Sequence, residues 1–432
     1  MLSERVKEKL FSYADRLHFL IFTSKMGVEM KKFIGNLSWS FFGGVIAAGI
    51  MLVVNVVAGR ILGPEDYGKY GLIIAVASIL LIPMLLGVDT SLTHYIARAS
   101  SKKEKDEYVA SAIWMTILSI GIATIVILLL IPDLQQFLGL DINIIKLGTL
   151  FAIFLAVRNF LDSVIKGLGL FEFQSKLRII EAILVGLVFL FFLYLGVLSY
   201  ELYILAILAG YTVVFLASLW RLRNINRMTV KYSKEIIIYG TYAILGSFFI
   251  LATNNFDKIL INRFIGPHEL GVYTAYMTVS FLLVTQAISL FINVFFAQVS
   301  TIRDDKMVCL KLNKLAFYIG IPSFVTLFLL TFTVVSFFGE SFYIDYYLVA
   351  GVSLLATLVA YTTVLWWLIA SRGTEGVRFT SSNGIIAGAA FLVLMYACHE
   401  ILSLYLVIFF LILAHVYLAI IGNIRYSRQA IK

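Results

Sequence analysis

The sequence predicts an all-α polytopic membrane protein with about twelve transmembrane helices, arranged as two parallel six-helix repeats around a central cavity. Hydrophobic residues make up 61% of the 432 residues and charged residues only 14%, whereas a soluble domain carries about 25% charged residues. The apolar residues form runs of about 20, enough to cross a hydrocarbon core about 30 Å thick. Because the runs lack the alternation of barrel strands, we expect helices, which satisfy every backbone amide inside lipid.

Each apolar run predicts one helix, and the connections between them are short. The predicted spans lie near residues 33–59, 70–96, 109–132, 143–166, 178–198, 202–220, 235–260, 269–298, 315–338, 346–370, 381–398 and 402–423.

The distribution of Lys and Arg predicts a multi-pass protein with both termini in the cytoplasm; separately, we expect the protein in the plasma membrane. Roughly 28 of them lie in the termini and the even-numbered connections, against about 5 in the odd-numbered ones, and short basic segments stay cytoplasmic. The five Trp residues fall near the same helix ends, where indole rings prefer the headgroup layer: Trp39, Trp114, Trp220, Trp366 and Trp367. The formal charge of +9 therefore reflects topology, and we expect no nucleic-acid partner.

The spans divide the chain into two halves with short flanking segments. We expect a cytoplasmic or interfacial N-terminal segment at 1–32, halves at 33–221 and 235–424, a basic linker at 222–234 and a tail at 425–432. The first segment mixes acidic and basic residues and does not resemble a cleavable signal peptide; Met30 is an alternative start. Cys309 and Cys398 fall on opposite sides of the membrane, so no disulfide is expected between them.

An eleven-residue pattern, R-x-x-G-P-x-x-x-G-x-Y, occurs twice, at Arg60–Tyr70 and Arg263–Tyr273. Locally, Gly63 ends one helix and Pro64 starts the next at its first position, and Gly266 and Pro267 repeat this turn. An even number of spans separates the copies, so both have the same orientation. The chain is therefore expected to be a parallel duplication, with a substrate path between halves that rock against each other.

Charged residues follow one face of the fourth predicted helix. Arg158, Asp162 and Lys166 are spaced four residues apart, with Asn159 beside them. Because a charge near the bilayer centre is costly unless it faces protein or water, this stripe should point inward. One interpretation is a cationic site that binds an anionic substrate through Arg158, Lys166 and Asn159. The alternative is a structural Arg158–Asp162 pair, with Lys166 reaching the headgroups.

Acidic side chains within the spans are candidates for ion coupling. Asp89 and Asp162 could each bind a coupling proton or sodium ion. Asp89 could equally cap a bend after Pro83, and His94 on the same helix is expected at the interface. Glu181 and Arg178 at the start of the fifth helix are explained by an ordinary interfacial pair.

Polar residues also crowd the external end of the seventh predicted helix. Asn255, Asp257 and Lys258, preceded by Asn254, could form an external gate. The adjacent opposite charges of Asp257 and Lys258 are also typical of a solvated helix end. Pro83 and Pro322 lie inside predicted spans, where each favours a bend.

Four segments resemble one known family: Gly35–Ser40, Asn55–Tyr70, Gly87–Leu92 and Thr253–Pro267. They are similar to prokaryotic polysaccharide transporters of the multidrug/oligosaccharidyl-lipid/polysaccharide superfamily. The resemblance implies a flippase that moves a polyprenyl-diphosphate-linked oligosaccharide from the cytoplasmic to the outer leaflet for cell-surface glycan synthesis. It also implies membrane lipids as surroundings, coupling to protons or sodium, and a glycan polymerase or ligase as partner.

Three other functions would make different demands on the sequence. A cation-coupled multidrug or small-molecule exporter would share the helices and the two halves, and Asp89 and Asp162 suit it. A membrane glycosyltransferase or polymerase would need a large external loop with acidic residues, and the longest predicted one is only 132–142. No nucleotide-binding loop, metal-ligand cluster or nucleophile motif is visible, so neither an enzyme nor a cofactor is expected. A scaffold that transports nothing would leave the buried charges unexplained.

Overall fold

The computed structural model describes residues 28–223, 229–246, 248–299, 305–371 and 374–429, and throughout these ranges the chain is helical without any strand. Much of the predicted N-terminal segment, part of the basic linker and the last residues of the tail lie outside the described residues. The helices in the first half are α2 (Val28–Leu85), α3 (Val88–Arg98), α4 (Lys102–Leu129), α5 (Ile131–Leu138), α6 (Ile142–Gly167), α7 (Phe171–Tyr194) and α8 (Tyr200–Leu222). Those in the second half are α9 (Ser233–Gly246), α10 (Phe248–Leu251), a π-helix (Ala252–Phe256), α11 (Asp257–Phe264), α12 (Pro267–Val299), α13 (Asp305–Ser336), α14 (Tyr346–Ala370), α15 (Thr374–Ala397) and α16 (Leu404–Gln429).

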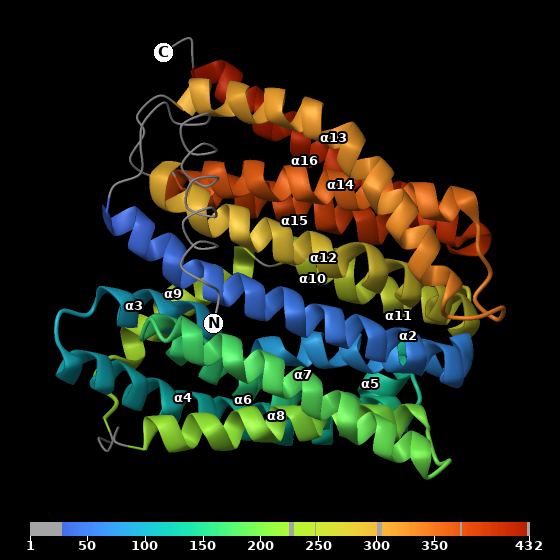
Figure 1. Ribbon diagram of the computed structural model, residues 1–432, viewed down its shortest axis with the longest axis horizontal. Coiled ribbons are helices and arrows are strands. Elements are labelled where there is room, and N and C mark those ends of the chain that lie inside the picture. The colour runs from blue at the N-terminus through green and yellow to red at the C-terminus, as the bar shows by residue number, and fades with distance from the viewer. Residues whose placement is uncertain (1–27, 224–228, 247, 300–304, 372–373, 430–432) are drawn as a thin grey trace, which may run out of the picture.

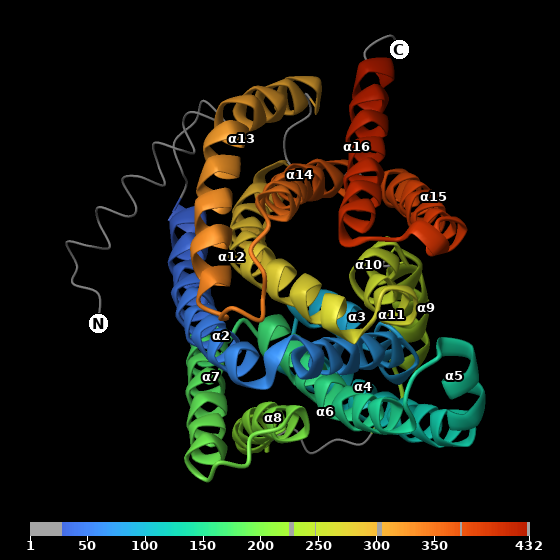
Figure 2. The ribbon, with the colours of Figure 1, turned by 90° about the vertical axis from the view of Figure 1, so that its right-hand side faces the viewer.

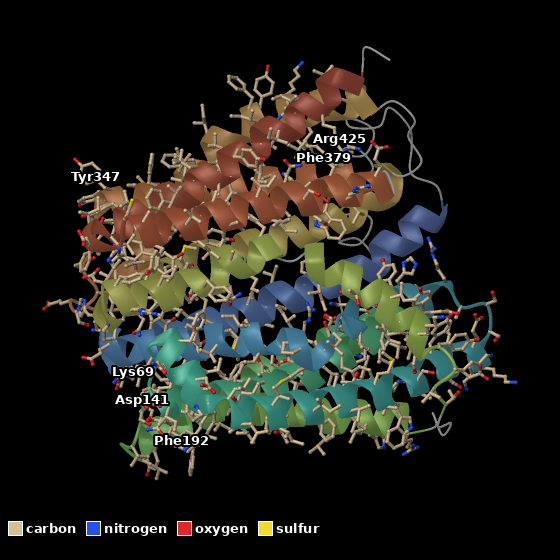
Figure 3. All side chains as sticks on the ribbon, turned by 180° about the vertical axis from the view of Figure 1, so that it is seen from behind. Lys69, Asp141, Phe192, Tyr347, Phe379 and Arg425 are labelled. Carbon is tan, nitrogen blue, oxygen red and sulfur yellow. The ribbon has the colours of Figure 1, made fainter. Side chains whose placement is uncertain are left out.

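These helices confirm the predicted polytopic membrane fold. Within the described ranges, nine helices are long and apolar enough to cross a membrane, and one of them, Phe42–Leu85, is 44 residues long. Large hydrophobic side chains on α4 and α13, such as Leu118 and Phe317, are exposed, as expected for helices that face lipid. Polar side chains gather at the ends: Lys69, Asp141 and Tyr347 lie at one end, and Arg425 lies toward the other (Figure 3).

Helix α2 holds the first predicted span and part of the second. The two parts meet at Gly63, where φ is 73° and ψ is 170°, and Pro64 begins the second part. Only glycine adopts this backbone conformation readily, and proline is well placed in the first turn of a helix. The predicted turn is therefore present at the first copy of the repeated pattern.

The second predicted span, 70–96, is not one continuous helix. It is interrupted at Leu86 and Gly87, with φ of 49° and 70°, and continues as α3. A leucine with positive φ is unusual and costs conformational energy. The predicted bend after Pro83 is thus a complete break in the helix, three residues farther along. Pro322 lies inside α13, which is visibly bent (Figure 2).

The seventh predicted span, 235–260, is also interrupted. It consists of α9, α10, the five-residue π-helix and α11. A π-helix inserts one extra residue into a helical turn and occurs often at functional sites. The predicted gate residues Asn255 and Asp257 lie at this insertion.

The two halves repeat helix by helix along the chain. The last residues of α7 and α15, Tyr194 and Ala397, are 203 positions apart. The same separation holds between the last residues of α6 and α14 and between Arg60 and Arg263. The parallel duplication therefore extends well beyond the eleven-residue pattern, whereas the predicted domain boundaries stay predictions.

The halves lie side by side along their length (Figures 1 and 2). Helices α4, α6, α7 and α8 occupy one side and α12 to α16 the other, with α2 between them and packed against α12. At the crossing of α2 and α12, a Cβ atom on Gly68 would collide with the Pro267 carbonyl. One on Gly271 would collide with the Pro64 carbonyl. The second glycine of each repeated pattern therefore allows the two backbones to touch.

A second contact joins the halves at the opposite ends of the helices, where α3 and α4 meet α9. Gly87 lies directly against the backbone of Gly240, and Ser91 Oγ donates a hydrogen bond of 2.9 Å to the Ile236 carbonyl. The rings of Tyr108 and Tyr232 stack with their centroids 4.0 Å apart. The charge pattern predicts that this end is cytoplasmic.

Candidate functional site

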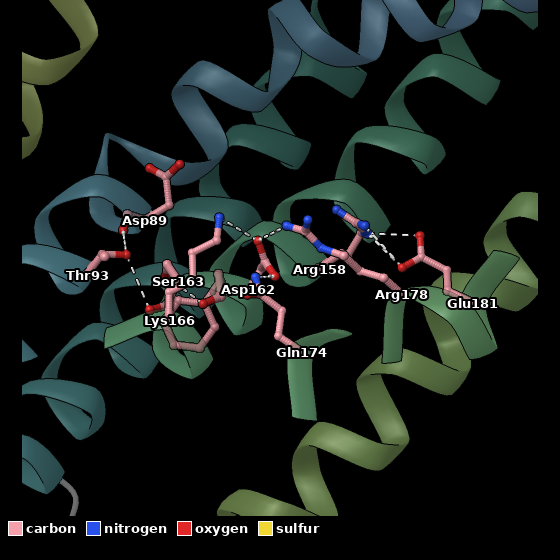
Figure 4. Close-up of polar contacts among 10 residues, drawn as sticks. Asp89, Thr93, Arg158, Asp162, Ser163, Lys166, Gln174, Arg178 and Glu181 are labelled. Carbon is pink, nitrogen blue, oxygen red and sulfur yellow. Dashed lines mark hydrogen bonds and ion pairs between the residues drawn. The ribbon is translucent and has the colours of Figure 1, made fainter. Parts of the chain in front are cut away.

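The candidate site is a cluster of charged side chains between the end of α6 and the start of α7 (Figure 4). A short connection, in which Gly169 has a φ of 72°, turns α7 back beside α6. Arg158, Asp162 and Lys166 lie on one face of α6, as their spacing predicted. Gln174, Arg178 and Glu181 lie four and three residues apart on α7 and face them.

Arg158 is bound by Glu181 of α7, not by Asp162. Its Nε lies 3.1 Å from Oε1 and 3.3 Å from Oε2 of Glu181, and its Nη2 lies 3.1 Å from Oε2. The guanidinium also lies 5.3 Å from the centre of the Tyr211 ring. The predicted Arg158–Asp162 pair and the predicted Arg178–Glu181 pair are both wrong, because the preferred partner comes from the neighbouring helix.

Asp162 is shared by two cations and an amide. Lys166 Nζ lies 2.8 Å and Arg178 Nη2 3.4 Å from the same oxygen, Oδ2. The other oxygen, Oδ1, accepts a hydrogen bond from Gln174 Nε2. Lys166 thus does more than reach the headgroups, although 42% of its side chain is exposed. The cluster holds three cations and two carboxylates, so positive charge exceeds negative by one.

The cluster encloses a cavity of about 10 Å³, which has room for roughly one water molecule. Two polar atoms beside it, Arg178 Nε and Gln174 Oε1, are buried and make no hydrogen bond with any described residue. Its lining comes only from α6, α7 and α8: Arg158, Asp162, Ile165, Gln174, Leu177, Arg178, Glu181 and Val214. The cavity therefore lies inside the first half, and the predicted central cavity between the halves stays a prediction.

Asp89 of α3 lies near this cluster, beside Lys166. Thr93 Oγ1 donates to the Ser163 carbonyl at 3.2 Å and so ties α3 to α6. Lys166 pairs with Asp162, and the half-buried Asp89 carboxylate interacts with the Lys166 ammonium electrostatically from the other side (Figure 4). Asn159 is half-buried on α6 beside Arg158. His94 stacks on Tyr239 of α9 with ring centroids 4.8 Å apart, so it takes part in the contact between the halves.

At the opposite end of the helices, Asp257 is buried instead of solvated. Its side chain is 0% exposed, Oδ2 accepts a 2.6 Å hydrogen bond from Tyr273, and Oδ1 accepts one of 2.7 Å from the Lys258 backbone. Lys258 Nζ lies 3.9 Å from the same carboxylate and donates to the Asn254 carbonyl. The interpretation as a solvated helix end is therefore wrong, and Asn255, two residues earlier, is half-buried.

The second half has neutral side chains where the first half has charges. Positions 203 residues after Arg158, Asp162 and Glu181 are Tyr361, Leu365 and Gly384. Tyr361 donates to Asn313 at 2.8 Å and accepts from Asn423 at 2.7 Å. Close by, the buried His415 bonds to Thr362 at 2.9 Å. The charged cluster is thus a property of one repeat alone.

Sequence reasoning missed Gln174 and Arg178 as members of this site. The fifth predicted span began at 178, whereas α7 begins at Phe171. The polar first turns of α7 lowered its apolar average and hid seven helical residues. The spacing of Gln174, Arg178 and Glu181 on one helical face was the signal that could have revealed them. Within the described ranges, no group of three or more His, Cys, Asp or Glu side chains could hold a metal ion.

Comparison with known proteins gives matches in sequence and in structure. A family model described as polysaccharide biosynthesis protein matches residues 33–302. An uncharacterised membrane protein of Methanocaldococcus jannaschii is 24% identical over 279 residues, which cover 56% of this chain and 53% of that protein. The match thus spans about half the length of this curated relative.

Solved structures of similar fold cover nearly the whole chain. An inward-facing multidrug resistance MATE family transporter of the MOP superfamily superposes with a TM-score of 0.69 at 16% identity, covering 92% of this chain and 98% of that one. A MOP superfamily transporter from Pyrococcus furiosus, described by the reverse polarity of its binding pocket, gives 0.66 at 16% identity and covers 93% and 96%. At this identity the likeness shows the fold.

Proposed function

The chain belongs to the polysaccharide biosynthesis protein family of MOP superfamily transporters, and on this premise we propose that it flips a polyprenyl-diphosphate-linked oligosaccharide. The substrate would pass from the cytoplasmic to the outer leaflet by alternating access and feed the synthesis of a cell-surface glycan. The family and the fold make the chain a multi-pass membrane transporter. The lipid-linked substrate, the plasma membrane, the cytoplasmic termini and a polymerase or ligase partner are parts of the proposal.

The observation that carries the proposal is the charge excess between α6 and α7. Three cations face two carboxylates there, at helix ends that the charge pattern predicts to be cytoplasmic. Burying charges near a membrane is costly, and an unbalanced cation is stabilised by an anionic ligand. A diphosphate held at the cytoplasmic headgroup layer is such a ligand. Arg158, Lys166 and Asn159 are the proposed binding residues on α6.

Ion coupling and gating are assigned to the carboxylates outside this network. Asp162 is already shared by two cations, so Asp89 is the better candidate for a coupling proton or sodium ion. Asn255, Asp257 and Lys258 at the π-helix are the proposed external gate, because an interrupted helix can change its hydrogen bonds at low cost.

A second candidate function is cation-coupled export of a small molecule. It is favoured by Asp257, a fully buried carboxyl group on an interrupted helix of the second half. A buried carboxylate of this kind is a common coupling site in transporters. The charge excess in the first half favours the anionic lipid-linked substrate over this alternative.

The test is transfer between leaflets in liposomes. Purified protein is reconstituted with a fluorescent polyprenyl-diphosphate oligosaccharide, and a membrane-impermeant quencher reports the fraction in the outer leaflet, with and without a proton or sodium gradient. Empty vesicles give the background rate. Protein-dependent transfer of the diphosphate-linked oligosaccharide supports the proposal. Transfer at the rate of empty vesicles under every gradient would move the assignment to the small-molecule exporter.

A further inference from the structure

The two arginines of the charged cluster differ in how their guanidinium groups are used. Arg158 presents the Nε/Nη2 edge to both oxygens of Glu181, with distances of 3.1 to 3.3 Å. This edge is the fork that matches a carboxylate or a phosphate. The fork of Arg158 is therefore occupied, and an anion could use it only by displacing Glu181.

The same edge of Arg178 makes only one long contact with a carboxylate. Its Nη2 lies 3.4 Å from Asp162, at the outer limit of a hydrogen bond, and its Nε is buried without a partner among the described residues. A buried donor without a partner destabilises the protein unless a water molecule or a ligand accepts from it. The fork of Arg178 thus has an unsatisfied donor, and Arg178 is one of the residues that line the small cavity of the cluster.

Lys166 completes an unbalanced set of charges around Asp162. Both Lys166 Nζ and Arg178 Nη2 approach the single oxygen Oδ2 of Asp162, so the two cations share one carboxylate, and Asp89 adds only a longer-range attraction on Lys166. Lys166 is the more accessible of the two, with 42% of its side chain exposed against 26% for Arg178. It lies in the last turn of α6, where the headgroup layer is expected.

We propose that Arg178 and Lys166 together form the site that receives the phosphate-bearing group of the substrate, and that Arg158 with Glu181 is a positioning pair. This inference rests on the proposed function; it keeps Lys166 as a binding residue and assigns Arg178 to that role in place of Arg158. The cavity itself holds only about one water molecule. The anion therefore approaches from the exposed side of Lys166, and Arg178 turns its open fork toward it. Before the anion binds, Asp162 keeps Lys166 and Arg178 in position through its contacts with both cations.

The test compares single neutral substitutions on neighbouring turns. Arg178→Gln and Lys166→Gln each leave Asp162 one cationic partner, so both variants should fold. Lys176→Gln is the matched control, because Lys176 lies on the same helix, is 61% exposed and pairs with Glu172 outside the cluster. Binding of the fluorescent polyprenyl-diphosphate oligosaccharide in nanodiscs should weaken about tenfold to a hundredfold in the first two variants. It should be unchanged in Lys176→Gln.

Additional arms identify the group that is bound and the role of Arg158. Inorganic pyrophosphate and the anionic lipid phosphatidylglycerol are used as competitors, since both carry phosphate oxygens. Competition by pyrophosphate assigns the site to the diphosphate, and competition by phosphatidylglycerol alone would assign it to bulk lipid and overturn the inference. Arg178→Lys keeps the charge without the fork and should restore only part of the affinity.

The outcomes separate this inference from the proposed function. Wild-type affinity in Arg178→Gln and Lys166→Gln, with loss in Arg158→Gln/Glu181→Gln, would overturn the inference and leave the flippase proposal standing. A wild-type protein that neither binds nor transfers the labelled lipid would refute the function itself. Circular dichroism and thermal unfolding of each variant exclude misfolding as the cause of lost binding.

Discussion

At the scale of single residues, Asp257 shows how this protein keeps a carboxyl group inside a helical bundle. The group is fully buried, but Tyr273 and the Lys258 backbone donate hydrogen bonds to it, and the Lys258 ammonium lies 3.9 Å away. Isolated charges in such surroundings are very costly, whereas charges with several donors are tolerated. The buried position of Asp257 therefore depends on the hydroxyl group of Tyr273, which is 16 residues away in the sequence.

Tyr273→Phe should destabilise the protein by about 1–3 kcal/mol, because it removes a donor from a buried carboxyl group and adds nothing in return. Unfolding in detergent with increasing denaturant measures the loss. Tyr347→Phe is the control, because Tyr347 is 82% exposed and its hydroxyl group faces the surroundings. Equal stability of the two variants would show that Asp257 does not depend on Tyr273.

Asp257→Asn tests the proposed external gate separately. If the gate depends on the charge, the variant should favour one state of access, so that cysteines introduced at the two ends of the helices change their labelling rates in opposite directions. Wild-type labelling at both ends would remove Asp257 from the gate and leave it a structural residue.

The sequence predicted which residues of the charged cluster share a helical face, and it failed to predict their partners. Spacing of four residues places Arg158, Asp162 and Lys166 on one face whatever surrounds the helix. The choice between Asp162 and Glu181 as partner of Arg158 depends on where α7 packs, and no local pattern encodes that. Burial of Asp257 escaped prediction for the same reason, since Tyr273 comes from the next helix.

At the scale of helices, apolar runs predicted a helix at each of the nine candidate spans found in the described residues, and Pro83 predicted a bend, but neither a complete break after Pro83 nor the π-helix was predicted. The break at Leu86 and Gly87 and the π-helix at Ala252–Phe256 change the backbone over a few residues only. A hydropathy window averages over a whole span and cannot detect such a change. Both breaks occur where the helix contributes to the contact between halves or to the proposed gate.

The close crossing of α2 and α12 at the glycines of the repeated pattern predicts how an alanine substitution there changes stability. Gly271→Ala places a methyl group on the Pro64 carbonyl, so the backbones of α2 and α12 must separate. Overpacking of this kind costs about 1–3 kcal/mol. Gly49→Ala on α2 is the control, because its new Cβ meets nothing within 4 Å and alanine is the better helix former by about 0.5–1 kcal/mol.

Thermal unfolding of both alanine variants in the same detergent measures this difference. We expect a lower midpoint for Gly271→Ala and an equal or higher midpoint for Gly49→Ala. A Gly271→Ala protein as stable as the wild type would mean that the two helices are not held together by this crossing.

At the scale of the whole molecule, two contacts hold the halves together at opposite ends. One is the glycine crossing of α2 and α12, and the other joins α3 and α4 to α9 through Gly87, Gly240 and the Tyr108–Tyr232 stack. A transporter that exposes its site alternately to the two sides must open the contact of α3 and α4 with α9 when the site faces that end. The predicted cytoplasmic contact includes the stacked rings of Tyr108 and Tyr232, which can separate when the halves move apart.

Joining the halves covalently at that contact should stop transport. Ser111 Oγ lies 3.4 Å from the Tyr232 backbone nitrogen, so cysteines at these positions can be linked by oxidation or by a short bifunctional reagent. Transfer of the labelled lipid should fall to the empty-vesicle rate and return on reduction. Cysteines at Ser280 and Thr331, which are 2.8 Å apart within the second half, form the control pair. Full transport in the linked Ser111/Tyr232 protein would show that this contact never opens.

The crossing of α2 and α12 has a mechanical consequence. Helices usually pack by interdigitating their side chains, and these side chains would clash if one helix rotated against the other. Where Gly68 and Gly271 meet, each backbone touches the carbonyl of the other helix's proline and no side chain stands between them. Because no side chains interdigitate at this crossing, rotation of one half against the other meets less steric resistance here than at an ordinary helix interface. The two copies of the pattern thus form a pivot about which the halves can rotate. The charged cluster, which belongs to the first half alone, moves with that half.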